Sequence, residues 1–452
     1  MFSEAVYLGR RRALASALAA RCGQAGVVLL LGHDDSPYTF AANPYAFRQD
    51  STLLYYTGLA EPGLAVLIDL ASGETELVCD QQPEDELIWF TRETPQALAQ
   101  RCGAHRVISH AALARLLGDL QAQQCRIHHL AAWRPAQAER LAALLGAGAP
   151  VVASVELVRC IVAQREVKEA TELAQIETAL AVSARMHLCA ANMAASGVPE
   201  RAIVNAMTEV VAGAGMRMAY PPICTRDGQV LHHLRHDNTL REGDLLLIDA
   251  GAEAASGYAS DITRTHCIGG AWRDEQVLMR EAARIAQVAC ADAARPGVPM
   301  AHIHRLAAQR LVECLAPLGL FRGSIEAVLE SGAYALVFPH GVGHLLGLDV
   351  HDMESLGEDL VGYDEQHARD SCFGPNHLRL GKPLREGMTI TLEPGVYFIP
   401  ALWRRWQASG LHRDLVNADV AERCMALGGL RTEDNFVITP SGARRLGPPG
   451  HG

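Results

Sequence analysis

The stretch Asp244-Leu-Leu-Leu-Ile-Asp249-Ala-Gly251, followed by Ser260-Asp261-Ile-Thr-Arg264, decides the expected fold of this 452-residue chain. It predicts an apolar strand that ends in a carboxylate, then a glycine turn and a second strand with another carboxylate. Two inward-facing acids on neighbouring strands repel each other unless a cation lies between them. Asp249 and Asp261 are therefore a candidate metal-binding pair.

The same pattern recurs 144 positions after Asp249. The stretch Glu386-Gly-Met-Thr-Ile-Thr-Leu-Glu393-Pro-Gly395 repeats the register of Glu242-Gly-Asp-Leu-Leu-Leu-Ile-Asp249-Ala-Gly251, and Glu433 supplies the second acid. A repeated register of this kind indicates an internal duplication. It predicts four carboxylates at equivalent points of two halves related by a pseudo-twofold axis.

The length predicts two domains. Residues 1–158 alternate short strands with helices, which is typical of an α/β domain without metal-ligand spacing. Residues 159–452 predict an α+β domain in which helix, helix, strand and strand occur twice. The second copy carries an insertion, residues 397–427, which is aromatic enough to pack as a lid or wall.

The composition narrows the class of protein. The chain is 49% hydrophobic and 20% charged, which is typical of a folded protein, and its net charge of -11 argues against nucleic acid or an anionic membrane as partner. Its twelve cysteines contain no Cys-x-x-Cys pair and indicate a reducing compartment. No apolar run reaches the roughly 18 residues of a membrane span. We expect a cytoplasmic protein.

A glycine-rich segment between the two halves, Pro339-His340-Gly-Val-Gly-His344, brings a histidine to the acids. Glycines beside a histidine allow close backbone approach. Four carboxylates and His344 are too many ligands for one tetrahedral zinc ion with an open position. They fit two divalent ions that share bridging carboxylates, and mostly oxygen ligands favour manganese, with cobalt, iron and zinc as alternatives. Two such ions can hold a bridging hydroxide that attacks a polarised carbonyl.

Each residue also has an ordinary structural interpretation. Asp249 before Ala-Gly could be a turn acid, Asp261 could pair with Arg264, and Glu433 beside Asp434 could be a solvated charge. His344 taken alone is more often a loop histidine than a ligand. The duplicated register is what favours a joint site.

These motifs resemble those of the pita-bread metallopeptidases, in the proline-specific branch of aminopeptidase P and prolidase. The resemblance covers nearly the whole chain and implies a creatinase-like N-terminal domain before the pita-bread domain. It implies five metal ligands, which are Asp249, Asp261, His344, Glu393 and Glu433. It also implies that Glu393 moves the proton of the nucleophilic water, and that His232, His340 and His351 contact the substrate, where imidazoles can stabilise an oxyanion.

Two further positions concern substrate recognition. Arg431 lies two residues before Glu433, so strand periodicity places both on one face and brings Arg431 to the site. The resemblance implies that Tyr220 and Ile223 line an apolar pocket for the proline ring, although an ordinary core role explains them equally well. The expected substrates are small peptides with proline in second position.

The choice between dipeptidase and aminopeptidase depends on Arg379. Leu378-Arg379-Leu-Gly-Lys-Pro-Leu-Arg-Glu-Gly387 resembles the prolidase segment whose arginine binds the free carboxylate of proline. Residues 47–51 and 85–90 resemble aminopeptidase P at least as closely. We favour an Xaa-Pro dipeptidase, with an aminopeptidase as the alternative. Metal-free amidinohydrolases and peptide-binding modules share the fold, but they predict gaps among the five ligand positions. By family analogy we expect a homodimer.

Overall fold

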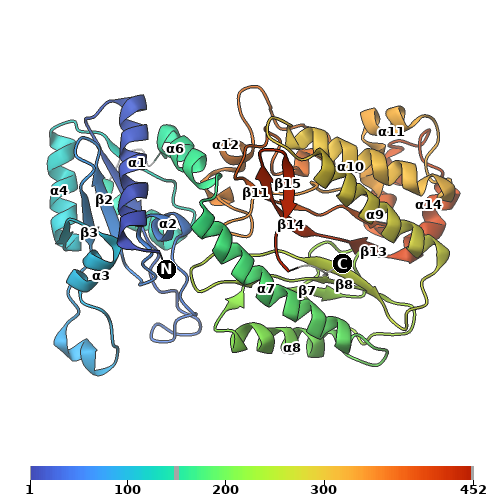
Figure 1. Ribbon diagram of the computed structural model, residues 1–452, viewed down its shortest axis with the longest axis horizontal. Coiled ribbons are helices and arrows are strands. Elements are labelled where there is room, and N and C mark those ends of the chain that lie inside the picture. Colours follow the sequence, from blue (N-terminus) through green and yellow to red (C-terminus); the bar gives the residue numbers. More distant parts are fainter. Residues whose placement is uncertain (1, 147–151, 449–452) are drawn as a thin grey trace. The chain divides into compact units, whose positions relative to one another are not determined.

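The computed structural model describes residues 2–146 and 152–448, which form two compact units (Figure 1). The first unit contains Met1–Arg165 and Met353–Leu360, and the second contains Glu166–Asp352 and Val361–Gly452. The sequence placed the boundary at residue 158. The first unit extends to Arg165 because helix α6 (Val155–Arg165) packs on α1 (Glu4–Cys22).

The first unit is built on one five-stranded sheet with the order β4-β3-β2-β1-β5. Strand β1 is entirely buried, and it runs antiparallel to β2 and parallel to β5. On α1, the buried Arg11 donates hydrogen bonds to Thr75 and to the carbonyl oxygens of Tyr56 and Cys102, so the buried charge is satisfied. The elements are β1 (Val27–Leu31), α2 (Ser51–Thr57), β2 (Ala65–Asp69), β3 (Thr75–Val78), α3 (Pro95–Cys102), β4 (Arg106–Ile108), α4 (His110–Ala122), β5 (Ile127–His129) and α5 (Pro135–Leu145).

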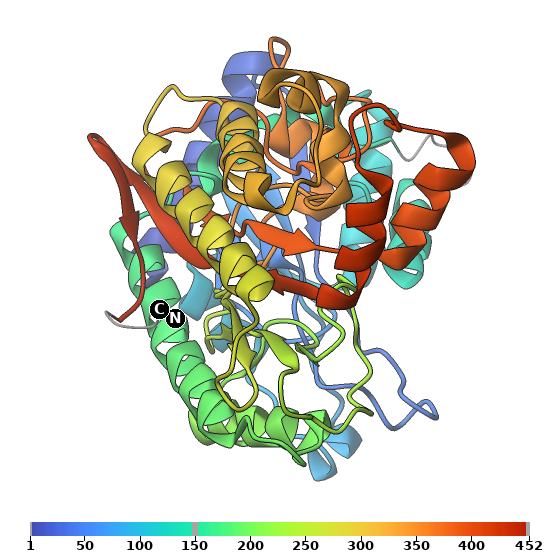
Figure 2. The ribbon, with the colours of Figure 1, turned by 90° about the vertical axis from the view of Figure 1, so that its right-hand side faces the viewer.

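The second unit has the duplicated α+β architecture of the pita-bread fold. Helices α7 and α8 lie side by side, as do α9 and α10 (Figures 1 and 2). Each helix pair precedes its own three-stranded sheet, β10-β8-β7 in the first half and β11-β14-β15 in the second. The elements are α7 (Ala170–Met193), α8 (Glu200–Gly213), β7 (Ile223–Thr225), β8 (Leu245–Asp249), β10 (Thr263–Cys267), α9 (Asp274–Ala293), α10 (Met300–Leu315), β11 (Thr389–Leu392), β14 (Asp434–Thr439) and β15 (Gly442–Arg445).

Matched hydrogen bonds show that the two halves repeat one another. The Gly197 N–H donates to the Leu240 carbonyl at 2.9 Å, and the Gly297 N–H donates to the Leu384 carbonyl at the same distance. Leu240 and Leu384 return the bond to Val198 and Val298, again at 2.9 Å in each half. In each half, the Gly-Val-Pro motif therefore joins the start of the second helix (α8 or α10) to the segment that leads into the strand (β8 or β11) through the same hydrogen bonds.

The insertion in the second half folds as two helices, α13 (Pro400–Ser409) and α14 (Ala418–Cys424). Leu402, Trp403 and Trp406 are buried, and the Trp403 indole donates to Glu422 at 2.7 Å, which ties α13 to α14. The insertion is thus a packed element of the unit, as its aromatic content predicted.

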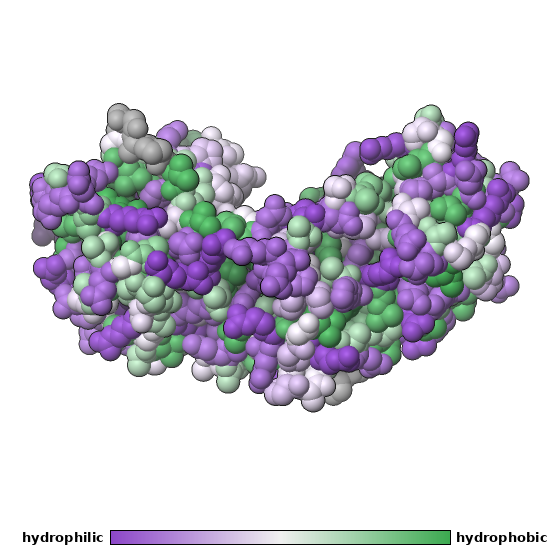
Figure 3. Space-filling model, turned by 90° about the horizontal axis from the view of Figure 1, so that it is seen from above, coloured by the Kyte–Doolittle hydropathy of each residue, from purple (hydrophilic) through white to green (hydrophobic). Residues whose placement is uncertain are grey.

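The surface is mixed in character. On the face that Figure 3 displays, hydrophilic and hydrophobic residues are interspersed. Among the residues that the structure describes, no helix combines the length and the apolar character that a membrane span requires.

Candidate active site

The four acids lie at the ends of strands in the second unit. Asp249 ends β8, and Asp261 lies just before β10, with Thr263 paired to Asp249 across the two strands. Glu393 directly follows β11, and Glu433 lies between β13 (Gly429–Arg431) and β14. The halves meet where the Glu433 N–H donates to the Thr263 carbonyl at 3.1 Å. This bridge brings acids that are far apart in the sequence to one place.

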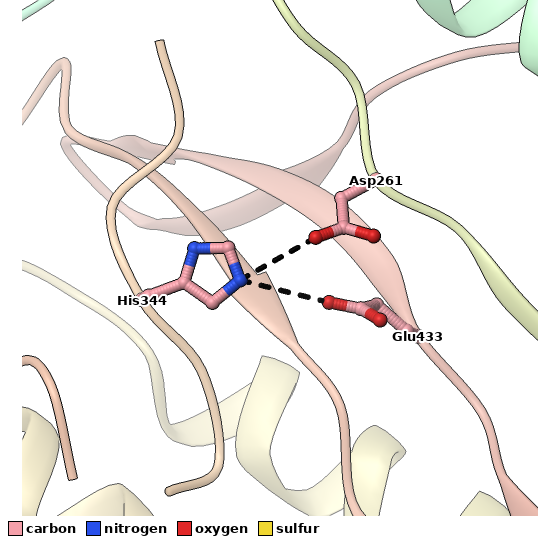
Figure 4. A group of neighbouring side chains, drawn as sticks. All are labelled: Asp261, His344 and Glu433. Atoms are coloured by element: carbon pink, nitrogen blue, oxygen red, sulfur yellow. Dashed lines mark ion pairs between the residues drawn. The ribbon is translucent and has the colours of Figure 1, made fainter. Parts of the chain in front are cut away.

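His344 faces three of these acids. Its Nε2 lies 3.4 Å from an oxygen of Asp261, 3.8 Å from Glu393 and 3.9 Å from Glu433. Figure 4 shows the imidazole pointing between the Asp261 and Glu433 carboxylates. Its Nδ1 lies 3.0 Å from the Leu345 carbonyl oxygen, which favours a proton on Nδ1 and leaves Nε2 as the ligand atom. Gly343 makes this approach possible, since a Cβ there would lie 2.0 Å from the Thr391 carbonyl oxygen.

Two polar side chains hold the acids of the first half. Arg431 forms an ion pair and hydrogen bond with Asp249 through its guanidinium. The Tyr220 hydroxyl lies 2.6 Å from Asp249 and 2.5 Å from Asp261. Tyr220 therefore contacts the acids themselves, a role that the sequence did not predict for it.

Burial and mutual repulsion dominate the electrostatics. Burial, together with the neighbouring carboxylates, raises the pKa values of Asp261, Glu393 and Glu433 well above their ordinary values. Burial works against the charge of Arg431, but Tyr397 and the carboxylates, led by Asp249, hold its pKa well above the ordinary arginine value. Arg431 thus remains a cation among the four acids.

The residues present fit divalent cations. One ligand atom each from Asp261, His344 and Glu433 lies within 4.8 Å of the others, and all three residues are buried. Glu433 Oε1 is buried without a hydrogen-bond partner among the described residues, while Oε2 accepts from Thr263 at 2.8 Å. A buried carboxylate oxygen that accepts no hydrogen bond and lies among other acids is an atom that a cation would stabilise.

The structure bears on two of the alternative roles that the sequence left open for these acids. Glu433 is 1% exposed and is therefore not a solvated charge. Arg264 pairs with Asp434 at 2.7 Å and also donates to the Thr263 and Glu433 carbonyls.

The three histidines that the resemblance assigns to the substrate, His232, His340 and His351, occupy different settings. The His351 ring packs against His344 with the ring centroids 4.1 Å apart. The His232 side chain is exposed by surface area, but partial desolvation still lowers its pKa. The charges of Arg431, Asp249, Arg379 and His351 also act on it, so it lies near the cluster. Burial lowers the pKa of His340 to about 3.

Both ring nitrogens of His340 have partners. Nδ1 lies 2.8 Å from the Gly341 carbonyl oxygen and Nε2 lies 3.0 Å from the Tyr397 hydroxyl. This arrangement leaves no ring N–H of His340 for a substrate. The neighbouring His233 and His236 bind backbone carbonyls, at 2.9 Å and 3.0 Å, which fits structural roles.

The two remaining positions differ in how close they lie to the acids. Ile223 is buried in a small cluster with Leu247 and Tyr397, where it supports the site from the core. Arg379 is half-buried, and its positive charge opposes the rise in the pKa of Glu393 that burial and Glu433 cause. Arg379 therefore lies close enough for its charge to act on Glu393.

Sequence reasoning missed several polar partners. The Tyr397 hydroxyl accepts from Arg431 at 2.9 Å and so links Arg431 to His340. Asn435 brackets the backbone of Asp261, accepting from its N–H at 3.0 Å and donating to its carbonyl. Tyr397 does follow Glu393 at a spacing of four residues, but only the antiparallel pairing of β12 (Gly395–Tyr397) with β13 brings it to Arg431.

Comparison with known families identifies the catalytic unit. Residues 174–440 match the model of metallopeptidase family M24, and residues 7–128 match the aminopeptidase P N-terminal domain. The chain belongs to metallopeptidase family M24. Membership implies divalent metal ions, in agreement with the cation-binding group of this M24 peptidase.

Individual relatives of the M24 peptidase cover nearly all of it. "Probable Xaa-Pro aminopeptidase PEPP" of Fusarium vanettenii is 30% identical, over 88% of this chain and 84% of that protein. "Xaa-Pro dipeptidase" of Homo sapiens is 28% identical, over 94% of this chain and 86% of that protein. The solved structure of proline aminopeptidase P II from Yersinia pestis superposes with a TM-score of 0.78 at 25% identity, covering 98% of this chain and 96% of that one.

Proposed function

We propose that this M24 metallopeptidase is an Xaa-Pro dipeptidase, which hydrolyses the bond between a first residue and a C-terminal proline. The observation that carries the proposal is the position of Arg379, whose charge acts on both His232 and Glu393. An arginine beside the catalytic groups is suited to bind the free carboxylate of a dipeptide, because its planar fork matches a carboxylate bidentately. The names of the relatives support Xaa-Pro specificity.

Five side chains would hold two divalent ions: Asp249, Asp261, His344, Glu393 and Glu433. Four oxygen donors with one imidazole favour manganese over zinc. When bound, such ions polarise the scissile carbonyl and lower the pKa of water towards neutrality.

The protein groups around these ligands would divide the remaining work. Glu393, whose Oε1 lies 3.8 Å from His344 Nε2, would accept the proton of the attacking water. His232 and His351 would donate hydrogen bonds to the carbonyl oxygen as it gains charge. Arg431 would keep Asp249 oriented through their ion pair. His340 would act indirectly, by holding the Tyr397 hydroxyl at 3.0 Å.

Recognition of proline would use shape, because the ring removes the N–H that other peptidases bind. The Tyr220 ring, whose hydroxyl is engaged by the acids, would form one wall of the pocket. Ile223 would pack in the core beneath this pocket wall, in its cluster with Leu247 and Tyr397.

An Xaa-Pro aminopeptidase is the second candidate. It is favoured by the Fusarium vanettenii relative and by the Yersinia pestis structure, which are both named aminopeptidases. An aminopeptidase must leave an exit for a longer peptide beyond proline, where a dipeptidase places a cation.

A homodimer remains a prediction by family analogy, and light scattering of the purified protein tests it.

Turnover of a Gly-Pro dipeptide and a Gly-Pro-Gly tripeptide, by the wild type and by Arg379→Ala, tests the choice. We expect Arg379→Ala to lower kcat/KM about 50-fold for the dipeptide and less than threefold for the tripeptide, because only the dipeptide places a carboxylate at this position. Arg444→Ala, which removes an exposed arginine paired with Glu177, serves as the control. Equal losses on both substrates would refute the carboxylate role, and faster tripeptide turnover by the wild type would favour the aminopeptidase.

A further inference from the structure

Arg379 lies in a segment that has little regular structure of its own. The short 3-10 turn Pro375–His377 lies directly before this segment, and the next strand along the chain is β11. A loop of this kind keeps one conformation only where other groups hold its backbone. The contacts that fix the backbone of residues 378–382 therefore decide where the Arg379 guanidinium lies.

Two consecutive residues of the same unit, Gly362 and Tyr363, hold this segment on both sides of Arg379. On the C-terminal side, the Gly362 carbonyl accepts from the Gly381 N–H at 2.8 Å and from the Lys382 N–H at 3.0 Å. On the N-terminal side, the Tyr363 hydroxyl donates to the Leu378 carbonyl. We call Gly362, Tyr363 and these contacts the Arg379 clamp.

The clamp is tightly fitted. A Cβ at Gly362 would lie 1.9 Å from the Arg379 carbonyl oxygen, so only glycine permits this approach. Tyr363 is 8% exposed, and its ring lies under the Arg369 guanidinium at 4.7 Å. Arg369 itself donates to the same Leu378 carbonyl at 3.1 Å and to the Asn376 carbonyl at 3.0 Å. The Leu378 carbonyl thus has two donors that also pack on each other.

We propose that Tyr363 and Arg369 are positioning residues that set the specificity of this enzyme, by fixing the Leu378 carbonyl and so aiming Arg379 at the substrate carboxylate. Neither residue needs to touch the substrate. The inference rests on the proposed dipeptidase function, since it assigns a purpose to the clamp only where Arg379 binds a carboxylate. A bidentate contact requires the guanidinium in one orientation, and small displacements of a site are costly.

The experiment compares Ala-Pro with Ala-Pro-amide, which has the same shape but no carboxylate, in steady-state assays. Tyr363→Phe keeps the ring and removes the hydroxyl. We expect it to raise KM for Ala-Pro about fivefold, with kcat within twofold and no change for Ala-Pro-amide. Arg369→Met should act in the same direction, and Arg369→Lys should recover part of the loss. Tyr334→Phe removes another buried tyrosine hydroxyl, which contacts His304, and is the matched control.

A merely structural role predicts something else, namely equal losses on both substrates together with a lower melting temperature. That result would overturn the inference, as would a Tyr363→Phe variant that behaves like the wild type. Arg379→Ala, assayed in parallel, separates the two proposals. If Arg379→Ala selectively impairs Ala-Pro and Tyr363→Phe does not, the clamp inference fails while the dipeptidase proposal stands. If Arg379→Ala impairs both substrates equally, both fail.

Discussion

The two halves of the catalytic unit share one backbone plan and differ in what they attach to it. The first half supplies Asp249 and Asp261, twelve residues apart, with Tyr220 between their carboxylates. The second half supplies Glu393 and Glu433, forty residues apart, with His344 facing them and two inserted helices between. The comparison teaches that duplication fixes where the acids lie, while residues outside the shared register decide what surrounds them.

The largest expected effect comes from removing His344, the proposed ligand that only the second half provides. His344→Ala should lower kcat/KM by more than 1,000-fold, because a buried imidazole that faces three acids is lost. Elemental analysis should find less bound metal in the variant than in the wild type. His233→Ala removes a histidine that binds only a backbone carbonyl and should retain activity. Full metal content and activity in His344→Ala would break the proposed asymmetry between the halves.

The next effect concerns a buried histidine in each half, His187 on α7 and His304 on α10. Burial lowers the pKa of each from 6.5 to about 4. Between pH 4 and pH 6.5 each imidazole is protonated in the unfolded state and neutral in the folded state. The contribution of each histidine to the free energy of unfolding is therefore fully present above pH 6.5 and is lost as the pH falls to about 4. Each group should contribute roughly 2–3 kcal/mol to this loss.

Urea unfolding of the wild type and of His304→Gln at pH 7, 6, 5 and 4 measures the contribution. We expect the free energy of unfolding of the variant to fall less steeply over this range, because the group that is forced to stay neutral has been removed. His367→Gln, which removes a histidine paired with Asp364 at the surface, should keep the slope of the wild type. Parallel slopes for His304→Gln and the wild type would contradict the assignment.

A smaller effect should come from Tyr220, which contacts both acids of the first half. Tyr220→Phe removes the hydroxyl that lies 2.6 Å from Asp249 and 2.5 Å from Asp261. We expect a fall of about tenfold in metal affinity and in kcat, because the two acids lose a shared hydrogen-bond donor. A metal titration followed by calorimetry and activity checks this. Unchanged affinity would show that the ligand geometry of the first half depends on Arg431 alone.

The smallest effect should come from the insertion, which the first half lacks. Trp403→Phe loses the hydrogen bond to Glu422 that joins α13 to α14, and should lower the free energy of unfolding by about 1 kcal/mol. We expect kcat/KM to change less than twofold. Trp133→Phe, at a tryptophan that is 57% exposed, is the control. A large loss of activity in Trp403→Phe would make the insertion part of the active site.

Much of the fold could be predicted because it depends on local pattern. Apolar strands that end in an acid before glycine, and the repeated Gly-Val-Pro helix starts, are short-range signals with a direct physical cause. They predicted the pairing of two halves, the helices near α7 and α9, and a packed insertion. The first compact unit ends at Arg165, seven residues after the boundary expected from the sequence, because the packing of α6 on α1 is a contact between distant segments.

The sequence by itself determined the family, the duplicated plan and the set of acids that meet a histidine, since ligand chemistry and register are written in residue type and spacing. Only the tertiary structure decided which groups surround that set. Tyr220 contacts the acids, both nitrogens of His340 are occupied, and Tyr363 holds the backbone beside Arg379. The physical reason is that hydrogen bonds depend on distance and direction in space, and loops far apart in the chain set both.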